Sequence, residues 1–332
     1  MFTSAHSTRD FVLHIAGGFS VDAIVRADGS FETDRLGGNA LWAAMGAHMS
    51  GTTPGLHAVV GRDYPLAALE RLAELGFDIS GVRRSETGLG VRVTFSYAAD
   101  GSRIQPATVR AVAGVPEPYR ARFIDTTRMP DELLQALPTA EELHTEETSG
   151  WHLGLLPSAR FRELVWHLSG ASAYLQVDCP ARFELRRDGL GVLGETLDQV
   201  DVFLPSTSDT DVFAPGLGRV ELINRFHDLG ARTVVLKCAE DGALVSEAAG
   251  TIWHVPSHIE SAVVDPTGAG DVFAGAFAAF MSRGRDLIES VSAAAAAASL
   301  SVTRRSPFDL VDIDPVELHR RRKRIAREVA AI

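Results

Sequence analysis

The sequence predicts an α/β protein: a three-layer α/β/α core with a mostly parallel central sheet, and a small antiparallel β unit beside it. Two observations carry this prediction. Short apolar segments typical of strands alternate with longer segments whose apolar residues recur at helical spacing. Two other segments alternate apolar and polar residues around an Asp-Gly pair, which is typical of a β-hairpin.

The strand-like segments are rich in apolar residues, as expected for parallel strands that helices cover on both faces. We expect strands at 11–16 (FVLHIA), 56–60 (LHAVV), 151–155 (WHLGL), 173–178 (AYLQVD), 200–204 (VDVFL) and 233–238 (TVVLKC). Because segments of helical periodicity separate most of these strands, the connections are crossovers and the strands run parallel.

The helical segments end near glycine or proline, which terminate helices. We expect helices at 39–50, 65–76, 131–138 and 220–230, of which the second and fourth end at Gly76 and Gly230. A helix is also expected after the glycine-rich segment at 265–270, where large and very small residues alternate for close packing.

The densest basic run, HRRRKRIAR at 319–327, lies near the C-terminal end of the sequence. Asp314 and Pro315 suit the N-terminus of a helix. The apolar residues that would share one face of this helix are Leu318, Ile325, Val329 and Ile332. We therefore expect the basic run on the solvated side of a helix and not in a nucleic-acid site.

The hairpin signals lie at 20–34, around Asp28-Gly29, and at 88–109, around Asp100-Gly101. We expect these two segments to form a small antiparallel sheet apart from the parallel one. A third hairpin is expected at Asp241-Gly242, at the edge of the main sheet.

Composition restricts the class of partner. The 332 residues are 45% hydrophobic, enough for a sizeable core, and carry a formal net charge of −11. A general nucleic-acid or anionic-membrane binder needs a positive field, so we expect small-molecule partners, no nucleic acid and no membrane. The two cysteines, Cys179 and Cys238, lie in apolar runs without partners for a disulfide framework or metal site. With no secretion signal recognisable, we expect a cytoplasmic protein.

The segment DPTGAGDVFAGAF, at 265–277, carries the strongest chemical signal. Gly268 and Gly270 lower helix stability by up to about 1 kcal/mol each relative to alanine, so they need another reason. Bare amides at a helix N-terminus form a site for phosphate. Asp271 beside such a site would take a proton from an attacking hydroxyl. The alternative is that Asp271 only caps the helix and the glycines serve a tight turn.

With its surroundings, the segment DPTGAGDVF resembles the second signature of the ribokinase family, the PfkB-type carbohydrate kinases. Other segments resemble this family in the family's order along the chain: LGGNALWAAMGAHMSG (36–51), VVGRDYPLAALERLAELGFDISGV (59–82), TGLGVRVTFSYAADGSR (87–103), VDCPAR (177–182) and VVLKCAEDGALV (234–245). The resemblance implies a single ribokinase-like domain over 1–332, with lid strands inserted at about 20–34 and 88–109.

The resemblance also implies the activity of an ATP-dependent kinase that phosphorylates the primary hydroxyl of a small sugar or sugar-like molecule. Asp271 would be the general base, and the amides of Gly268, Ala269 and Gly270 would form the anion hole. Asp22 would hold the hydroxyls of the acceptor together with Gly37, Gly38 and Asn39. The alternatives are that Asp22 is a turn residue and that Asn39 is a helix N-cap.

For ATP and Mg²⁺, the family pattern points to the second half of the chain but is altered there. Ser206 occupies the position where the family has an asparagine. Three residues later, Asp209 occupies the position of a glutamate and is the candidate metal ligand. The nucleotide-contacting pattern reads Lys237 to Gly242, with Ala239 in place of a glycine. The implied nucleotide-binding set is Lys237, Ala239, Gly242, Ser206, Gly268 and Gly270. Some relatives also use a monovalent cation, which the sequence leaves open.

The acceptor itself stays open at this point. The strand WHLGLLP lacks the charged residue that some relatives carry, and His152 or Arg103 could substitute for it. The alternative for His152 is a core histidine whose hydrogen bonds are satisfied within the protein. A nucleoside kinase is the alternative, with Phe31, Phe95 or Tyr97 of the lid stacked on the base. A non-catalytic sugar or nucleotide sensor is a third possibility. We also expect a homodimer that pairs through the β lid.

Overall fold

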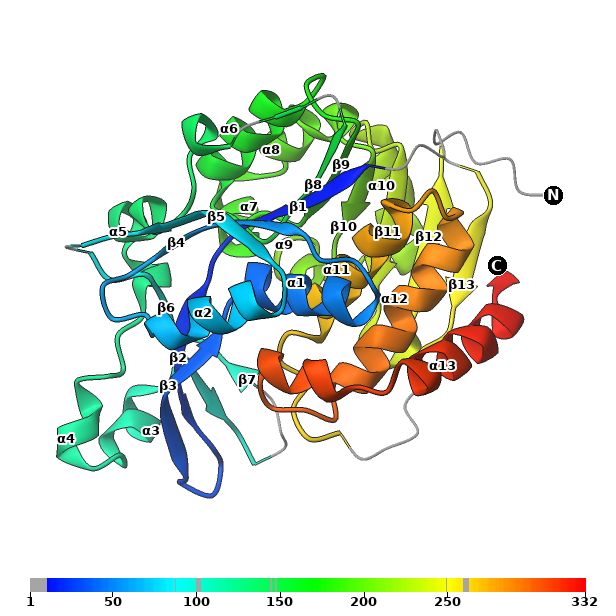
Figure 1. The fold of residues 1–332 in the computed structure, drawn as a ribbon. Coiled ribbons are helices and arrows are strands. Elements are labelled where there is room, and N and C mark those ends of the chain that lie inside the picture. Colours follow the sequence, from blue (N-terminus) through cyan, green and yellow to red (C-terminus); the bar gives the residue numbers. More distant parts are fainter. Residues whose placement is uncertain are drawn as a thin grey trace.

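A large sheet of ten strands forms the centre of the computed structural model, which describes residues 11–86, 88–99, 103–143, 145–146, 148–248, 250–258 and 263–332 (Figure 1). The strand order within this described part is β14-β13-β12-β11-β10-β9-β8-β1-β4-β5. The strands are β1 (Val12–Ala16), β4 (Gly55–Val60), β5 (Asp78–Arg84), β8 (Ser149–Leu153), β9 (Tyr174–Asp178), β10 (Val202–Leu204), β11 (Thr233–Lys237), β12 (Ala243–Glu247), β13 (Ile252–Val255) and β14 (Ala330–Ala331).

From β5 to β11 all neighbouring strands pair in parallel, and β12, β13 and β14 extend the sheet with antiparallel pairs. The six strands expected from the apolar segments are therefore confirmed. The hairpin at Asp241-Gly242 is also confirmed, because it joins β11 to β12. It does not lie at the outermost edge, since β13 and β14 pair beyond it.

Helices cover both faces of the large sheet, which gives the expected three layers. The helices are α1 (Asn39–Met49), α2 (Leu66–Glu74), α3 (Val109–Ala113), α4 (Glu117–Arg120), α5 (Pro130–Gln135), α6 (Ser158–Leu168), α7 (Arg182–Asp188), α8 (Gly191–Gly194), α9 (Thr207–Phe213), α10 (Arg219–Asp228), α11 (Ala269–Met281), α12 (Leu287–Ser301) and α13 (Pro315–Glu328). One apolar core includes residues of α1, α2, α11, α12 and α13, and a second includes residues of α6, α7, α8 and α10. The helices expected at 39–50, 65–76, 131–138 and 220–230 correspond to α1, α2, α5 and α10, and the helix expected after 265–270 is α11.

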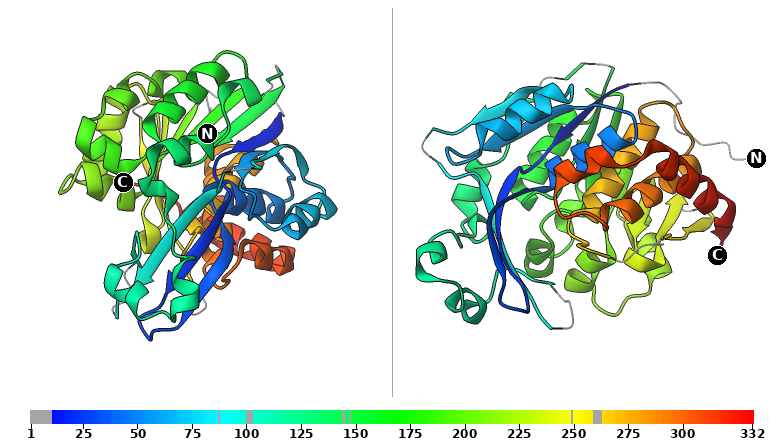
Figure 2. Two further views of the ribbon diagram at one scale, coloured as in Figure 1. Left: turned by 90° about the vertical axis from the view of Figure 1, so that its left-hand side faces the viewer. Right: turned by 60° about the horizontal axis from the view of Figure 1, so that its bottom comes forward.

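A second sheet of four strands projects from the three-layer core (Figure 2). Its order is β3-β2-β6-β7, from β2 (Ser20–Val25), β3 (Phe31–Gly37), β6 (Val91–Tyr97) and β7 (Arg103–Ile104). The first hairpin turns as expected, with Gly29 at φ 82°. The turn expected at Asp100-Gly101 lies outside the described residues.

Both hairpins are antiparallel as expected, but β2 and β6 join them through a parallel pair. The small sheet is therefore mixed. The reason lies in the large sheet: β2 continues from β1 and β6 continues from β5, and these two strands run in the same direction there.

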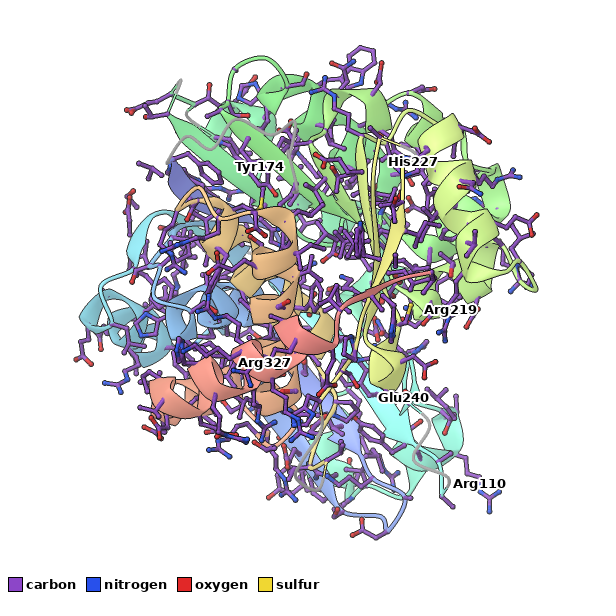
Figure 3. The ribbon with its side chains drawn as sticks, turned by 90° about the vertical axis from the view of Figure 1, so that its right-hand side faces the viewer. Arg110, Tyr174, Arg219, His227, Glu240 and Arg327 are labelled. Atoms are coloured by element: carbon purple, nitrogen blue, oxygen red, sulfur yellow. The ribbon has the colours of Figure 1, made fainter. Side chains whose placement is uncertain are left out.

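The C-terminal helix α13 corrects two expectations. Asp314 accepts a hydrogen bond from the Val316 N–H and caps the helix, as predicted. However, Arg321 from the basic run is only 3% exposed and bonds to Ser299. Ile332 is 65% exposed because the helix ends at Glu328 and the chain then pairs with β13. Figure 3 shows α13, labelled at Arg327, at the surface beside these strands.

Most of the candidate residues gather where the parallel strands end. Asp178 ends β9, Lys237 ends β11, and α9 begins shortly after β10. The carboxyl edge of such a sheet is where α/β proteins place their ligands. No helix in the described parts of the chain is both long and apolar enough to span a bilayer.

Candidate active site

The N-terminus of α11 lacks a side-chain cap. Gly268 precedes the helix in the left-handed region, at φ 78°, and a Cβ on it would lie 2.3 Å from the Trp42 ring of α1. Only glycine fits this position. Asp271 lies in the first turn and does not cap the helix, so the helix-cap alternative is wrong.

The amides of the predicted anion hole are not equivalent. The Ala269 N–H donates to the Pro266 carbonyl at 3.2 Å and is already in a turn. The N–H groups of Gly270 and Asp271 lie in the first helical turn, where no helical carbonyl precedes them. These two donors can therefore receive an anion.

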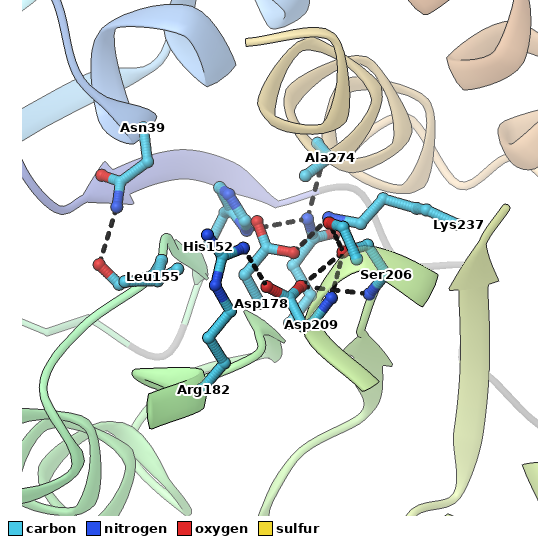
Figure 4. A network of polar contacts seen from close by, with 11 residues as sticks. Asn39, His152, Leu155, Asp178, Arg182, Ser206, Asp209, Lys237 and Ala274 are labelled. Atoms are coloured by element: carbon cyan, nitrogen blue, oxygen red, sulfur yellow. Dashed lines mark hydrogen bonds and ion pairs between the residues drawn. The ribbon is translucent and has the colours of Figure 1, made fainter. Parts of the chain in front are cut away.

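A buried ion pair flanks this helix end. Lys237 at the end of β11 pairs with Asp178 at the end of β9, and both side chains are almost completely buried (Figure 4). The Lys237 Nζ also lies 3.8 Å from where a Cβ on Gly270 would be. A positive charge therefore sits beside the uncapped first turn of α11.

The pKa of Asp271 is raised to about 7, chiefly by burial and then by the negative charge of Asp178, while Lys237 and Arg103 oppose the rise. Burial also raises the pKa of Asp178 to about 6, against the opposing charge of Lys237. A carboxyl group whose pKa lies near neutral pH is suited to proton transfer.

The N-terminus of α9 is arranged differently. The Ser206 Oγ accepts a hydrogen bond from the Asp209 N–H, and the Asp209 Oδ2 accepts hydrogen bonds from the Ser206 N–H and Oγ. The other oxygen, Oδ1, accepts from Arg182 Nη1 at 3.1 Å. Both oxygens of the predicted metal ligand are thus engaged. Among the residues that the structure describes, no group of three or more His, Cys, Asp or Glu side chains is arranged to hold a metal ion.

The predicted nucleotide turn follows β11. Ala239 adopts the left-handed region at φ 52°, the conformation for which glycine is the usual residue. Gly242 is also left-handed, at φ 84°, and a Cβ there would lie 2.1 Å from the Val255 carbonyl oxygen. The turn keeps a glycine-type backbone although alanine replaces the glycine that the family pattern expects.

On the acceptor side, Asp22 lies inside β2 and is 4% exposed, so it is not a turn residue. Its Oδ2 lies 2.5 Å from where a Cβ on Gly37 would be, which explains the small residue there. Burial raises the pKa of Asp22 to about 7, opposed by a hydrogen bond from Ser20 and by the charge of Arg35. Its Oδ1 has no hydrogen-bond partner among the described residues.

Asn39 is the first residue of α1 and not its N-cap, which is Gly38. Its Oδ1 accepts from the Gly18 N–H at 2.9 Å, and its Nδ2 donates to the Leu155 carbonyl at 2.7 Å (Figure 4). Asn39 therefore ties together the loops that follow β1 and β8, and only its remaining donor and lone pair are free for an acceptor.

The remaining candidates for binding the acceptor are a histidine, an arginine and three aromatic residues, and most of them already have partners within the protein. His152 is fully buried, and Gln176 Nε2 lies 3.1 Å from its Nδ1; burial, followed by the charge of Lys237, lowers its pKa to about 3. Arg103 lies over the Phe95 ring, 4.6 Å from the centroid. Phe31 packs against Tyr119, and the Tyr97 hydroxyl bonds to Thr267.

Sequence reasoning missed several residues of this site. Asp178 was detectable, because it ends an apolar strand in the segment VDCPAR. Arg182 lies in that same segment. Asp265 begins the segment DPTGAGDVF but was given no role there, and Arg35, which pairs with it at 2.7 Å, gave no signal in the sequence.

In sequence and in fold, the chain is similar to known sugar and nucleoside kinases. Residues 185–312 match the model of the pfkB family carbohydrate kinases. The cytidine kinase of Thermococcus kodakarensis is 28% identical over 281 residues, covering 84% of this chain and 91% of that protein. A nucleoside kinase of Burkholderia thailandensis, solved with ADP-inosine, shares the fold with a TM-score of 0.70 at 15% identity, covering 95% and 96% of the two chains.

A putative ribokinase II of E. coli, solved with ATP and Mg²⁺, also shares the fold, with a TM-score of 0.67 at 21% identity over 95% of this chain and 99% of that one. This chain therefore has the fold of these ribokinases and nucleoside kinases. Residues 185–312 show the similarity to the pfkB family carbohydrate kinases that the sequence motifs predict, and the fold is that of the ribokinases.

Proposed function

We propose that this protein transfers the γ-phosphoryl group of ATP to the primary hydroxyl of a small sugar or of a sugar-containing molecule. The observation that carries the proposal is Asp271: a carboxyl group with a pKa of about 7 in the first turn of an uncapped helix, beside the Lys237 ammonium. Base and anion site are adjacent, as phosphoryl transfer to a hydroxyl requires.

In this proposal Asp271 accepts the proton of the attacking hydroxyl. The N–H groups of Gly270 and Asp271 hold the transferring phosphoryl group, with Gly268 providing the turn that leaves them uncapped. Lys237 adds positive charge, and Asp178 keeps that lysine protonated and in place. Most of the rate enhancement comes from positioning and from charges fixed before the reaction.

The nucleotide side is assigned by the family pattern together with this geometry. We propose that the turn containing Ala239 and Gly242 and the start of α9 at Ser206 line the ATP site. Structures of similar proteins solved with ATP or ADP support the use of a nucleotide.

A protein-held magnesium ion does not fit Asp209 as it stands, because Arg182 and Ser206 engage both carboxylate oxygens. We therefore assign no magnesium ligand to Asp209. Magnesium enters the assay below as the counter-ion of ATP.

For the acceptor, Asp22 is the first candidate because its buried Oδ1 lacks a partner among the described residues and would accept a hydroxyl. Gly37 and Gly38 supply the close backbone approach, and Asn39 supports the loop beside them.

A nucleoside is the second candidate acceptor, favoured by the similarity to a cytidine kinase over most of both chains. Its base would need a site other than the three aromatic residues first considered. Phe95 is buried beneath Arg103, Phe31 packs on Tyr119, and Tyr97 bonds to the loop before α11.

We also propose that the small sheet acts as the lid of a single domain and excludes water during transfer. Pairing of two copies through this sheet stays a prediction. Size-exclusion chromatography with light scattering tests it directly.

The experiment is ADP production by the purified protein with MgATP and a panel of acceptors: D-ribose, other pentoses, hexoses, a keto-deoxy acid, cytidine and inosine. We expect one class of acceptor to stimulate turnover and phosphate to appear on its primary hydroxyl. If no acceptor stimulates turnover while ATP or a sugar still raises the melting temperature, the protein is a sensor and the kinase proposal is wrong.

A further inference from the structure

Arg35 of β3 lies where the small sheet meets the loop that precedes α11. Its Nη1 donates to the Asp265 Oδ2 at 2.7 Å, and both side chains are only 8% exposed. Burial would raise the pKa of Asp265, but its hydrogen bonds with Thr267 and the charge of Arg35 outweigh burial and lower it. The contact is therefore a buried pair of opposite charges.

The same loop has a second contact with the small sheet. The Tyr97 hydroxyl of β6 lies 3.0 Å from the Thr267 Oγ1 and 3.4 Å from the Asp265 Oδ1. Asp265 also accepts from the Thr267 N–H at 2.9 Å, which folds the loop back on itself. Gly268 follows at once, so these contacts end directly at the turn into α11.

Arg35 also faces the acceptor side. It is the cross-strand partner of Asp22 in the β2–β3 register, and its charge opposes the burial that raises the pKa of Asp22. Within the described part of the chain, Arg35 Nη2 has no hydrogen-bond partner, and the same is true of Asp22 Oδ1. One side chain thus lies between the candidate acceptor residue and the candidate phosphate loop.

We propose that Arg35 is a positioning residue that holds the loop 265–268 against the small sheet and thereby orients the N–H groups of Gly270 and Asp271. This inference deepens the proposed function and rests on it. Breaking a buried ion pair leaves an uncompensated charge, so the loop should shift or open when Arg35 loses its charge.

The test compares Arg35→Gln with Arg35→Lys and with Arg122→Gln. Arg122 is a matched control, because it donates to the neighbouring Asp34 at 3.0 Å but is 55% exposed. Hydrogen exchange is followed in the peptide that covers 263–271 of the ligand-free protein, and binding is followed with the fluorescent nucleotide mant-ADP.

In Arg35→Gln we expect exchange in this peptide to be at least about tenfold faster and the mant-ADP Kd to rise about tenfold. Arg35→Lys should recover part of both effects because it keeps the charge. Arg122→Gln should change neither by more than about twofold, as for an exposed pair.

A double-mutant cycle separates this role from general loss of packing. Asp265→Asn alone and Asp265→Asn with Arg35→Gln should have similar effects, because both remove the same contact. Additive effects, wild-type exchange in Arg35→Gln, or faster exchange spread evenly over β1, β8 and β9 would overturn the proposal.

Failure of the wild type to bind the nucleotide and failure of Arg35→Gln to fold each have their own interpretation. If the wild-type protein does not bind mant-ADP, the proposed function fails, while the exchange comparison in the ligand-free protein still decides the role of Arg35. If Arg35→Gln does not fold, Arg35→Lys and Tyr97→Phe replace it. Each should speed exchange in the 263–271 peptide by a factor of about two to five, and unchanged exchange in both would refute the proposal.

Discussion

Two helices, α9 and α11, begin close together at the carboxyl edge of the large sheet and differ in how their first turns are satisfied. In α9 the side chains of Ser206 and Asp209 cap the helix reciprocally. In α11 the N-cap is Gly268, which has no side chain to offer. The difference shows that a carboxylate in the first turn of a helix can have two roles: Asp209 caps its own helix, whereas Asp271 does not cap α11 and is available for the role proposed above.

This comparison predicts the largest effect for Asp271→Asn, which keeps the size of the side chain but cannot take a proton. We expect kcat to fall by about a thousandfold or more. Asp209→Asn is the matched change in α9, and its kcat should fall by less than about tenfold, since it mainly alters a cap and an ion pair. ADP production measures both, and similar losses in the two variants would remove the distinction between the helices.

Gly268→Ala is expected to have the next largest effect. The new Cβ would overlap the Trp42 ring in a left-handed backbone, which should lower the free energy of unfolding by about 3 kcal/mol and weaken nucleotide binding. Gly76→Ala is the control: Gly76 has φ 89° but nothing within 4 Å of its added Cβ, so it should lose only about 1 kcal/mol. Urea denaturation compares the two, and equal losses would show that the contact with Trp42 does not matter.

The pH dependence of Asp271 gives a further test. Because its pKa in the ligand-free protein is raised to about 7, kcat/KM should fall about tenfold per pH unit below pH 7 as the carboxylate takes up a proton. A pKa that folding raises means that the folded state binds the proton more tightly. Its contribution to stability is therefore present below about pH 4 and lost as the pH rises to about 7.

Asp22 and Asp178 have raised pKa values as well, so the pH dependence of the wild type alone does not isolate Asp271. The stability of Asp271→Asn relative to the wild type should therefore increase between pH 4 and pH 7, as followed by urea midpoints. A constant difference over that range would contradict the raised pKa.

Ser206→Ala should have the smallest effect. It removes one half of the α9 capping box and should lower the free energy of unfolding by about 1 kcal/mol, with kcat changed by less than about threefold. Thermal and urea unfolding beside the kinetic assay check this. A large loss of turnover at unchanged stability would mean that Ser206 contacts the nucleotide more closely than its cap role requires.

Much of the fold could be predicted because local patterns determine it. The apolar runs predicted β1, β4, β8, β9, β10 and β11 but not β5, and the glycines at 268 and 270 predicted the helix end that stays uncapped. Ser206 and Asp209 also have the spacing of a capping box, so the engagement of Asp209 was readable from the sequence. The family pattern favoured a metal ligand at that position instead.

Long-range contacts could not be predicted in this way. Arg35 and Asp265 are 230 residues apart, and nothing in the sequence around either one specifies the other. The parallel pairing of β2 with β6 likewise depends on how the large sheet directs both chains. The end of α13 depends on β13, which draws the last residues away from the helix.

The ion pair between Asp178 and Lys237 has a practical consequence for chemical labelling. The chain contains only two lysines, Lys237 and Lys323. Acylating reagents attack the neutral amine. Burial would lower the pKa of Lys237, but Asp178 outweighs burial and raises it, whereas Lys323 lies on the exposed side of α13. A brief pulse of reagent should therefore modify Lys323 and spare Lys237. Modification of Lys237, detected by mass spectrometry, would then report that the ion pair with Asp178 has opened.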